Sequence, residues 1–234
     1  MPSIAVPALL VHLLGGCSGG EPTRDMGGNS AAATPDAPVA NAAAPIPDGK
    51  LVLAFGDSLY AGYGVGPRES FPAQLQVALR AGGVPATVVN AGVSGDTTAG
   101  GRARLAYALD GLPRKPDLVL LGLGGNDMLR GLAPEEARAN LTAMMDELKR
   151  RGVPVMLTGM IAAPNLGRDY GARFNAIYPD LAKAYGATLD PFFLDGVVTD
   201  PRLMQGDRVH PTAQGIARIV RRVAPTVEAA LKGA

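Results

Sequence analysis

Residues 51–58, LVLAFGDS, place a continuous apolar run directly before a glycine, an aspartate and a serine. An apolar run without alternation that ends at a glycine is typical of a short strand buried on both faces of a parallel sheet. Four later runs have the same character, the last of them being the weakest: residues 86–92, 117–124, 153–160 and 187–192. The chain therefore contains the apolar runs of a five-stranded sheet.

Helical patterns separate or follow these runs, at residues 70–83, 133–152 and 212–233. Ser70 is predicted to cap the first helix, and Pro225 is predicted to kink or divide the last one. In the second pattern, acidic residues precede basic ones, which complements a helix dipole. Strands that alternate with helices predict an α/β fold, a three-layer α/β/α, flavodoxin-like sandwich around a five-stranded parallel sheet.

Polar and small residues follow the apolar runs, where each predicted strand ends. Ser58 follows the first run, Gly95 the second and Asn126 the third. Asp207 and His210 lie in the last loop, before the final helical pattern. Because the carboxyl ends of parallel strands lie at the same edge of a sheet, we expect all five residues to lie close together.

The chain contains two histidines, His12 and His210. His12 lies in an apolar N-terminal stretch with the character of a signal peptide, so imidazole chemistry would depend on His210. An imidazole can activate a serine hydroxyl, and a carboxylate such as that of Asp207 can hold the ring in the required tautomer. On its own, Asp-x-x-His is more typical of a surface polar pair or a helix cap. Its combination with Ser58 and the glycine and asparagine turns favours a catalytic serine.

Residues 4–17, IAVPALLVHLLGGC, are too short to span a bilayer but have the length of the apolar region of a signal peptide. The ending Leu-Gly-Gly-Cys resembles a bacterial lipobox, although no Lys or Arg precedes the apolar run. We expect residues 1–17 to be a lipoprotein signal peptide, with lipidation of Cys17 anchoring the protein to a membrane in the periplasm or cell envelope. The alternative is a disordered apolar N-terminus with an incidental thiol.

Residues 18–49 contain mostly Ala, Pro, Gly, Asn and Ser, with almost no large apolar side chain. Such a segment cannot bury enough surface to offset its ordering entropy, which predicts a disordered linker. The composition changes at Lys50, so we expect one folded domain over residues 50–234.

The composition argues against several other classes of protein. The formal net charge is +1, tryptophan is absent and no basic run occurs, so nothing indicates nucleic-acid binding. A single cysteine excludes a disulfide within the chain. No clustering of histidine, cysteine and carboxylate residues in the sequence suggests a metal site, and no cofactor is expected. We also expect a monomer.

Four short motifs resemble, in order, the blocks of the SGNH (GDSL) hydrolase superfamily: GDSL at 56–59, VSGDT at 93–97, GGND at 124–127 and DRVHP at 207–211. The similarity covers about residues 50–220 and is strongest to its group of periplasmic acyl-CoA thioesterases, lysophospholipases and arylesterases. Arg208 departs from the pattern, because a glycine or another small residue usually stands between the acid and the histidine.

The resemblance implies a role for each motif residue. Ser58 would be the nucleophile, His210 the general base and then acid, and Asp207 the residue that orients the imidazole. The backbone N–H groups of Ser58 and Gly95 and the side-chain amide of Asn126 would form the oxyanion hole. The implied activity is that of a serine esterase that hydrolyses small-molecule acyl esters or thioesters through an acyl-enzyme.

An apolar wall for the acyl chain is expected beside these residues, formed by Met128, Leu129, Leu132, Ile161 and Pro164. The alternative for the first three is packing at the start of the next helix. Two other functions stay open: a carbohydrate O-deacetylase, which the scarcity of aromatic residues disfavours, and a non-catalytic binding lipoprotein, which the complete set of motif residues disfavours.

Two other features beside the motifs have simpler interpretations. Asp57, Asp96 and Asp127 are interpreted as acceptors of backbone N–H groups that hold the turns, rather than as catalytic acids. The glycines of residues 62–66 lack the Lys-Ser/Thr pair of a phosphate-binding loop and are interpreted as part of a mobile loop.

Overall fold

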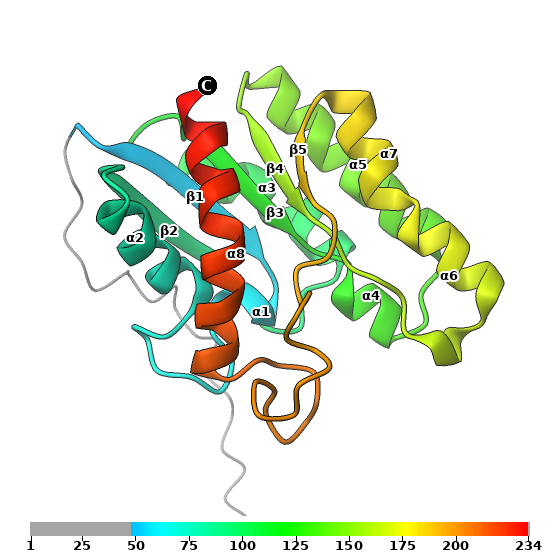
Figure 1. The fold of residues 1–234 in the computed structure, drawn as a ribbon. Coiled ribbons are helices and arrows are strands. Elements are labelled where there is room, and N and C mark those ends of the chain that lie inside the picture. Colours follow the sequence, from blue (N-terminus) through cyan, green and yellow to red (C-terminus); the bar gives the residue numbers. More distant parts are fainter. Residues whose placement is uncertain (1–47, 234) are drawn as a thin grey trace, which may run out of the picture. The chain divides into compact units, whose positions relative to one another are not determined.

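The computed structural model describes residues 48–233 of the chain. Five parallel strands form one sheet in the order β2-β1-β3-β4-β5. Their bounds are β1 Lys50–Gly56, β2 Ala86–Gly92, β3 Leu118–Gly122, β4 Val155–Thr158 and β5 Thr188–Asp190. The predicted five-stranded parallel sheet is therefore confirmed, with its loops after β2, β1 and β3 side by side (Figure 1).

Helices cover both faces of this sheet, which completes the predicted three-layer α/β/α sandwich (Figure 1). They are α1 Ser58–Ala61, α2 Phe71–Ala81, α3 Thr98–Asp110, α4 Gly125–Leu129, α5 Pro134–Arg150, α6 Arg168–Asn175, α7 Ile177–Tyr185 and α8 Ala213–Lys232, with a 3₁₀ turn η1 at Pro164–Leu166. Helix α2 packs against α8 on one face, whereas α3, α5, α6 and α7 pack together on the other.

The three helices predicted from the sequence are present, with ends that differ by one or two residues. Ser70 does occupy the N-cap position of α2, but its side chain makes no capping hydrogen bond. Helix α8 runs without a break through Pro225. Pro225 therefore does not divide the helix.

The strands are held by burial on both faces. In β1, Val52, Ala54 and Phe55 are each fully buried, and the central residues of β3 are equally inaccessible. Each large apolar side chain removed from water in this way contributes roughly 1.5–3 kcal/mol. The edge of the sheet at which the strands end is therefore a rigid base for the loops that follow.

The long segment between β5 and α8 is tied to the sheet by Arg222 of α8. Its guanidinium forms an ion pair with the buried carboxylate of Asp190, at the end of β5. It also donates hydrogen bonds to the backbone carbonyls of Phe192 and Phe193, at 3.0 and 2.8 Å. At the other end of the segment, Gly215 lies so close to the Leu203 carbonyl that a Cβ atom would approach it to 2.2 Å. These contacts fix where the loop containing His210 lies.

No helix within residues 48–233 is long and apolar enough to cross a membrane. The predicted signal peptide with Cys17, and nearly all of the predicted linker over residues 18–49, lie outside the described residues.

Candidate active site

Ser58 lies where β1 ends and α1 begins. Asp57 caps this short helix, and its carboxylate accepts a hydrogen bond from the Leu59 N–H at 3.0 Å. The Ser58 residue is 9% exposed, so its hydroxyl stands at the bottom of a depression rather than on the open surface. The transition from strand to helix places Ser58 at the edge of the sheet where the parallel strands end.

The structure brings His210 and Asp207 to this serine from the far end of the sequence. His210 Nε2 lies 2.8 Å from Ser58 Oγ, and His210 Nδ1 lies 2.7 Å from Asp207 Oδ2. With an ionised carboxylate, the ring carries its proton on Nδ1, and Nε2 is the atom that accepts from the serine hydroxyl. A continuous chain of hydrogen bonds therefore joins the three residues.

The Asp207 carboxylate also organises its own loop. Its Oδ1 atom accepts hydrogen bonds from the backbone N–H groups of Val209 and His210, at 2.9 and 3.0 Å. The hydrogen bond to the His210 side chain, followed by these backbone hydrogen bonds, lowers the pKa of Asp207 to about 2. Asp207 therefore stays ionised throughout the neutral and mildly acidic range.

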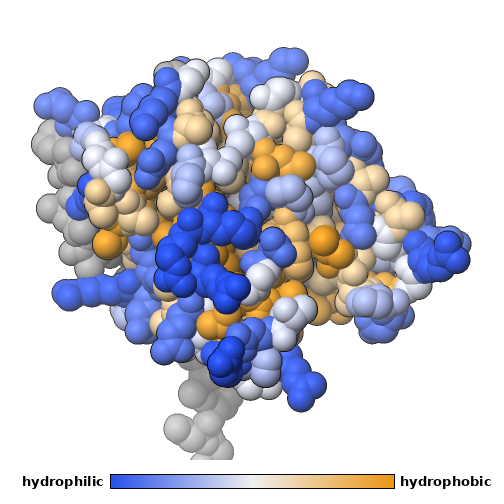
Figure 2. Space-filling model, in the orientation of Figure 1, coloured by the Kyte–Doolittle hydropathy of each residue, from blue (hydrophilic) through white to orange (hydrophobic). Residues whose placement is uncertain are grey.

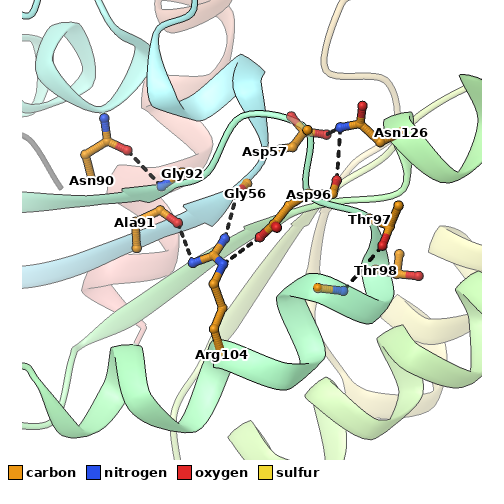
Figure 3. Close-up of polar contacts among 12 residues, drawn as sticks. Gly56, Asp57, Asn90, Ala91, Gly92, Asp96, Thr97, Thr98, Arg104 and Asn126 are labelled. Carbon is orange, nitrogen blue, oxygen red and sulfur yellow. Dashed lines mark hydrogen bonds and ion pairs between the residues drawn. The ribbon is translucent and has the colours of Figure 1, made fainter. Parts of the chain in front are cut away.

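Gly95 and Asn126 lie beside Ser58 on the neighbouring loops. Gly95 has φ of +84°, a left-handed conformation that favours glycine, although a Cβ atom there would meet nothing closer than Arg130 at 3.7 Å. The Asn126 amide donates to the Asp96 carbonyl at 2.9 Å and, less closely, to Asp57 Oδ2 at 3.4 Å (Figure 3). Within the described chain, no acceptor pairs with the backbone N–H groups of Ser58 and Gly95.

The three aspartates beside the motifs differ in their contacts. Asp127 accepts from both the backbone N–H and the hydroxyl of Thr98, and Asp57 accepts from a backbone N–H, as predicted. Asp96 instead forms an ion pair with Arg104 at 2.6 Å. Burial raises the pKa of Asp57 to about 6. The hydrogen bond from the Leu59 N–H and the charge of His210 lower this pKa, but by less than burial raises it.

Arg104 of α3 is a site-organising residue that the sequence analysis missed. Besides Asp96, its guanidinium donates to the backbone carbonyls of Ala91 and Gly56, at 2.8 and 2.9 Å (Figure 3). It also lies 4.0 Å from the centre of the Phe55 ring. One side chain thus joins the ends of β1 and β2 to the turn before α3. No motif marks this role in the sequence, because the carbonyls that Arg104 binds belong to residues far along the chain.

An open, mostly apolar cleft of about 600 Å³ extends from Ser58 over the ends of β3, β4 and β5. Four of the predicted wall residues line it: Met128, Leu129, Ile161 and Pro164. Leu132 does not, because it lies beyond the end of α4, where its carbonyl accepts from Tyr170 at 3.0 Å. The space-filling view shows hydrophobic and strongly hydrophilic residues side by side where the loops after the strands lie (Figure 2).

Two further residues hold the loop of the histidine, and neither was singled out from the sequence. The Tyr63 ring packs on the imidazole of His210 with a centroid separation of 4.4 Å. Gln205 Nε2 donates to the Tyr63 carbonyl at 2.8 Å and to the Pro211 carbonyl at 3.0 Å. The 62–66 glycine loop is therefore connected to the loop of His210 by a side-chain-to-backbone hydrogen bond as well as by a ring contact.

No group of three or more histidine, cysteine or acidic residues is placed to hold a metal ion within residues 48–233. What the site presents is a hydroxyl, an imidazole and a carboxylate in series, next to an apolar cleft. Such an arrangement can carry out nucleophilic acyl transfer.

Comparison with known proteins gives consistent results. The model of the GDSL-like Lipase/Acylhydrolase family matches residues 54–218. An arylesterase of Vibrio mimicus is 42% identical over 173 residues, which covers 74% of this chain and 86% of that protein. Esterase TesA of Pseudomonas aeruginosa is 39% identical over 179 residues, covering 76% of this chain and 88% of TesA.

Solved structures are similar to the same part of the chain. The crystal structure of AlinE4, an SGNH-hydrolase family esterase, has 52% sequence identity and a TM-score of 0.68, and it covers 80% of this chain and 98% of AlinE4. The match of one family model to most of the chain, together with these relatives, settles its membership. The chain belongs to the GDSL-like lipase/acylhydrolase family, the SGNH hydrolases.

Proposed function

We propose that this esterase hydrolyses acyl esters or thioesters with Ser58 as nucleophile, His210 as base and Asp207 as the residue that orients the base. The observation that carries the proposal is the chain of hydrogen bonds, 2.8 and 2.7 Å long, that links the three side chains beside an apolar cleft. The family provides the reaction class, because its named members here are an arylesterase and esterases.

In the first half-reaction, Ser58 Oγ forms a bond to the acyl carbon while its proton passes to His210 Nε2. The bond from the acyl carbon to the leaving oxygen or sulfur then breaks, and the imidazolium gives its proton to the leaving atom. Asp207, which remains ionised, stabilises the imidazolium during this step. The products are a free alcohol or thiol and an acyl-enzyme on Ser58.

In the second half-reaction, water takes the place of the departed alcohol or thiol. His210 accepts a proton from the water, whose oxygen bonds to the acyl carbon, and the bond from that carbon to Ser58 Oγ breaks. The proton returns to Oγ, which restores the free enzyme and releases a carboxylic acid.

Negative charge on the acyl oxygen would be stabilised by three donors. The backbone N–H groups of Ser58 and Gly95 are not engaged within the described chain and are thus available to an oxyanion. The third is the Asn126 amide, whose long contact of 3.4 Å with Asp57 marks the N–H that an oxyanion would compete for. Fixed donors of this kind lower the barrier because they need no reorganisation when the charge develops.

The acyl chain would occupy the apolar wall beyond Ser58. The cleft there is lined by Met128, Leu129, Ile161 and Pro164, and its described lining contains no exposed carboxylate that would lose its hydration when a hydrocarbon chain binds. This composition suits an acyl group better than a sugar ring, for which aromatic stacking surfaces are the usual partners.

Active-site labelling tests the proposal. Wild-type protein should react with a fluorophosphonate probe and hydrolyse 4-nitrophenyl butyrate, whereas Ser58→Ala should do neither. Ser70→Ala is the matched control, because Ser70 is buried beside α2, outside the cleft, and should leave the labelling intact. Labelling that persists in a folded Ser58→Ala variant would contradict the assignment, and a wild-type protein that neither labels nor hydrolyses would favour a binding lipoprotein.

The predicted attachment to a membrane is a separate proposal that rests on the Leu-Gly-Gly-Cys motif. Lipidation of Cys17 would anchor the domain in the cell envelope, with residues 18–49 as the tether. Cys17→Ser should move the full-length protein from the membrane fraction to the soluble fraction of cells. An unchanged fractionation would contradict the anchor without affecting the esterase assignment.

A further inference from the structure

Arg208 has an unusual backbone conformation for its residue type. Its φ of +59° lies in the left-handed region, and it is the one non-glycine residue with positive φ among residues 48–233. The conformation follows from the tight turn in which the Asp207 carboxylate accepts two backbone N–H groups. Glycine would adopt it without strain, so the arginine stands at a position that its backbone conformation disfavours.

The guanidinium of Arg208 is exposed and has no internal partner. It forms no hydrogen bond or ion pair with any side chain of the described chain, because the neighbouring Asp207 carboxylate is taken up by His210 and the turn. Arginine stays protonated and presents a planar fork of donors that suits carboxylates and phosphates. The turn therefore presents an unneutralised cation to solvent.

Arg208 also lies at the boundary between two hollows. It lines the cleft of Ser58 and a second hollow of about 640 Å³ formed by the segment around residues 198–208. Val198 lines both as well, so the two spaces adjoin. The second hollow is lined by no carboxylate, and Arg208 is the one charged residue in its wall.

The chemistry of the reaction decides which part of a substrate would reach this hollow. His210 gives its proton to the leaving oxygen or sulfur, so the alcohol or thiol departs on the side of the imidazole. Arg208 stands two residues before His210 on the same loop, whereas the apolar wall for the acyl chain is formed by α4 and the loop after β4. The cation is thus placed toward the leaving group.

We infer that Arg208 is a specificity-determining residue that binds an anionic group, a phosphate or a carboxylate, on the alcohol or thiol part of the substrate. The inference rests on the proposed function. It predicts that esters with a negatively charged leaving group are preferred over neutral esters of the same acid.

Two matched pairs of substrates test this. The first pair is 4-nitrophenyl butyrate and its analogue with a carboxylate beside the nitro group, and the second is S-butyryl-N-acetylcysteamine and butyryl-CoA, which adds phosphates. Arg208→Gln should lower the ratio of kcat/KM for the anionic over the neutral member about tenfold in at least one pair. A fall in the first pair alone identifies a carboxylate site, and a fall in the second identifies a phosphate site.

Three controls separate charge recognition from strain and from general electrostatics. Arg208→Gly relieves the backbone strain but should lower the ratio as Arg208→Gln does, whereas Arg208→Lys should recover part of it. Arg221→Gln removes the same charge from an exposed position on α8, away from the cleft, and should leave the ratio unaltered.

A ratio that is unaltered in both pairs, or that falls equally in Arg221→Gln, would overturn the inference. So would a variant that loses binding to phosphatidylglycerol vesicles while keeping the ratio, because Arg208 would then face a lipid surface. In either case, Ser58-dependent hydrolysis of the neutral esters would leave the proposed function standing. Wild-type protein that hydrolyses none of the four substrates would overturn both.

Discussion

Ser58 and Asn126 stand at the ends of buried strands, whereas Asp207 and His210 stand on an exposed loop, and His210 follows Ser58 by 152 positions in the sequence. One carboxylate in each half, Asp57 and Asp207, shows the same difference. Asp57 is buried, and its pKa is raised to about 6, whereas Asp207 is half-exposed and its pKa is lowered to about 2 by hydrogen bonds. Burial thus sets the direction of the pKa shift in the strand-end half, and hydrogen bonds set it in the loop half.

This contrast separates two ways of damaging the enzyme. Changes in the loop half should affect catalysis with little effect on folding, because little apolar surface is buried there. Changes in the strand-end half should alter stability as well, because its polar groups are desolvated. Variants in both halves test this difference.

His210→Ala removes the base and should lower kcat by about 10⁶-fold, which is the usual cost of removing the base from a catalytic triad. Thermal unfolding should change much less, because the imidazole contacts Ser58, Asp207 and the Tyr63 ring at the cleft rather than the apolar core. A Ser58→Ala, His210→Ala double variant should be no slower than either single variant, because the two residues act as a unit. If the fold-losses in kcat of the two single variants multiplied in the double variant, Ser58 and His210 would act independently.

Asp207→Asn should lower kcat by about 10⁴-fold, because the amide cannot favour the imidazole tautomer that accepts from Ser58. The loop itself should persist, since the asparagine oxygen can still accept the two backbone hydrogen bonds. Asp200→Asn is the control: Asp200 forms an ion pair with Arg202 outside the cleft, and its loss should leave turnover within about twofold. Equal losses in both variants would point to a general loosening of the loop.

Asn126→Ala should lower kcat by roughly 10²–10³-fold, the usual cost of one oxyanion donor. The amide also donates to the Asp96 carbonyl at 2.9 Å, so a smaller loss of stability should accompany the loss of rate. Asn140→Ala, a change of the same kind on α5, should not affect kcat. An effect of Asn126→Ala confined to KM would argue against a role in the transition state.

Asp57 should make stability depend on pH. Between pH 4 and 6 the unfolded chain has released the Asp57 proton while the folded chain retains it, so the free energy of unfolding falls as pH rises through this window. Between pH 4 and 7, the free energy of unfolding of the wild type should fall by on the order of 3 kcal/mol more than that of Asp57→Asn, because the pKa is shifted by about two units. Urea unfolding of both proteins at pH 4 and 7 measures it, and a constant difference between them would contradict the prediction.

The fold was predictable because its strands are continuous apolar runs and its main helices have strong end signals. Helix α3 was missed, since the Gly100-Gly101 pair disfavours a helix on local grounds. The structure gives the tertiary reason for one of these glycines: a Cβ atom on Gly101 would lie 2.2 Å from Leu123. Close packing against the loop after β3 therefore requires a residue that helix propensity argues against.

The members of the candidate site were predictable for a similar reason, because parallel strands bring the residues after them to one edge. The side chains that hold the site were not. Arg104 and Gln205 bind backbone carbonyls of residues far along the chain. Every residue carries such a carbonyl, so the residue type does not indicate which one is bound. Leu132 does not line the cleft, because it follows the end of α4 at Leu129 and lies beside Tyr170.

Gln205 has a consequence for how molecules enter and leave. By binding the carbonyls of Tyr63 and Pro211, its side chain holds the loop after α1 and the histidine loop together. A gate that opened by swinging this loop outward would pull the imidazole away from its serine. A movement that admits the acyl chain would therefore fall to the opposite rim, where Leu129 and Ile161 are 57% and 46% exposed. The base and the nucleophile would then keep their alignment while the acyl chain enters the cleft.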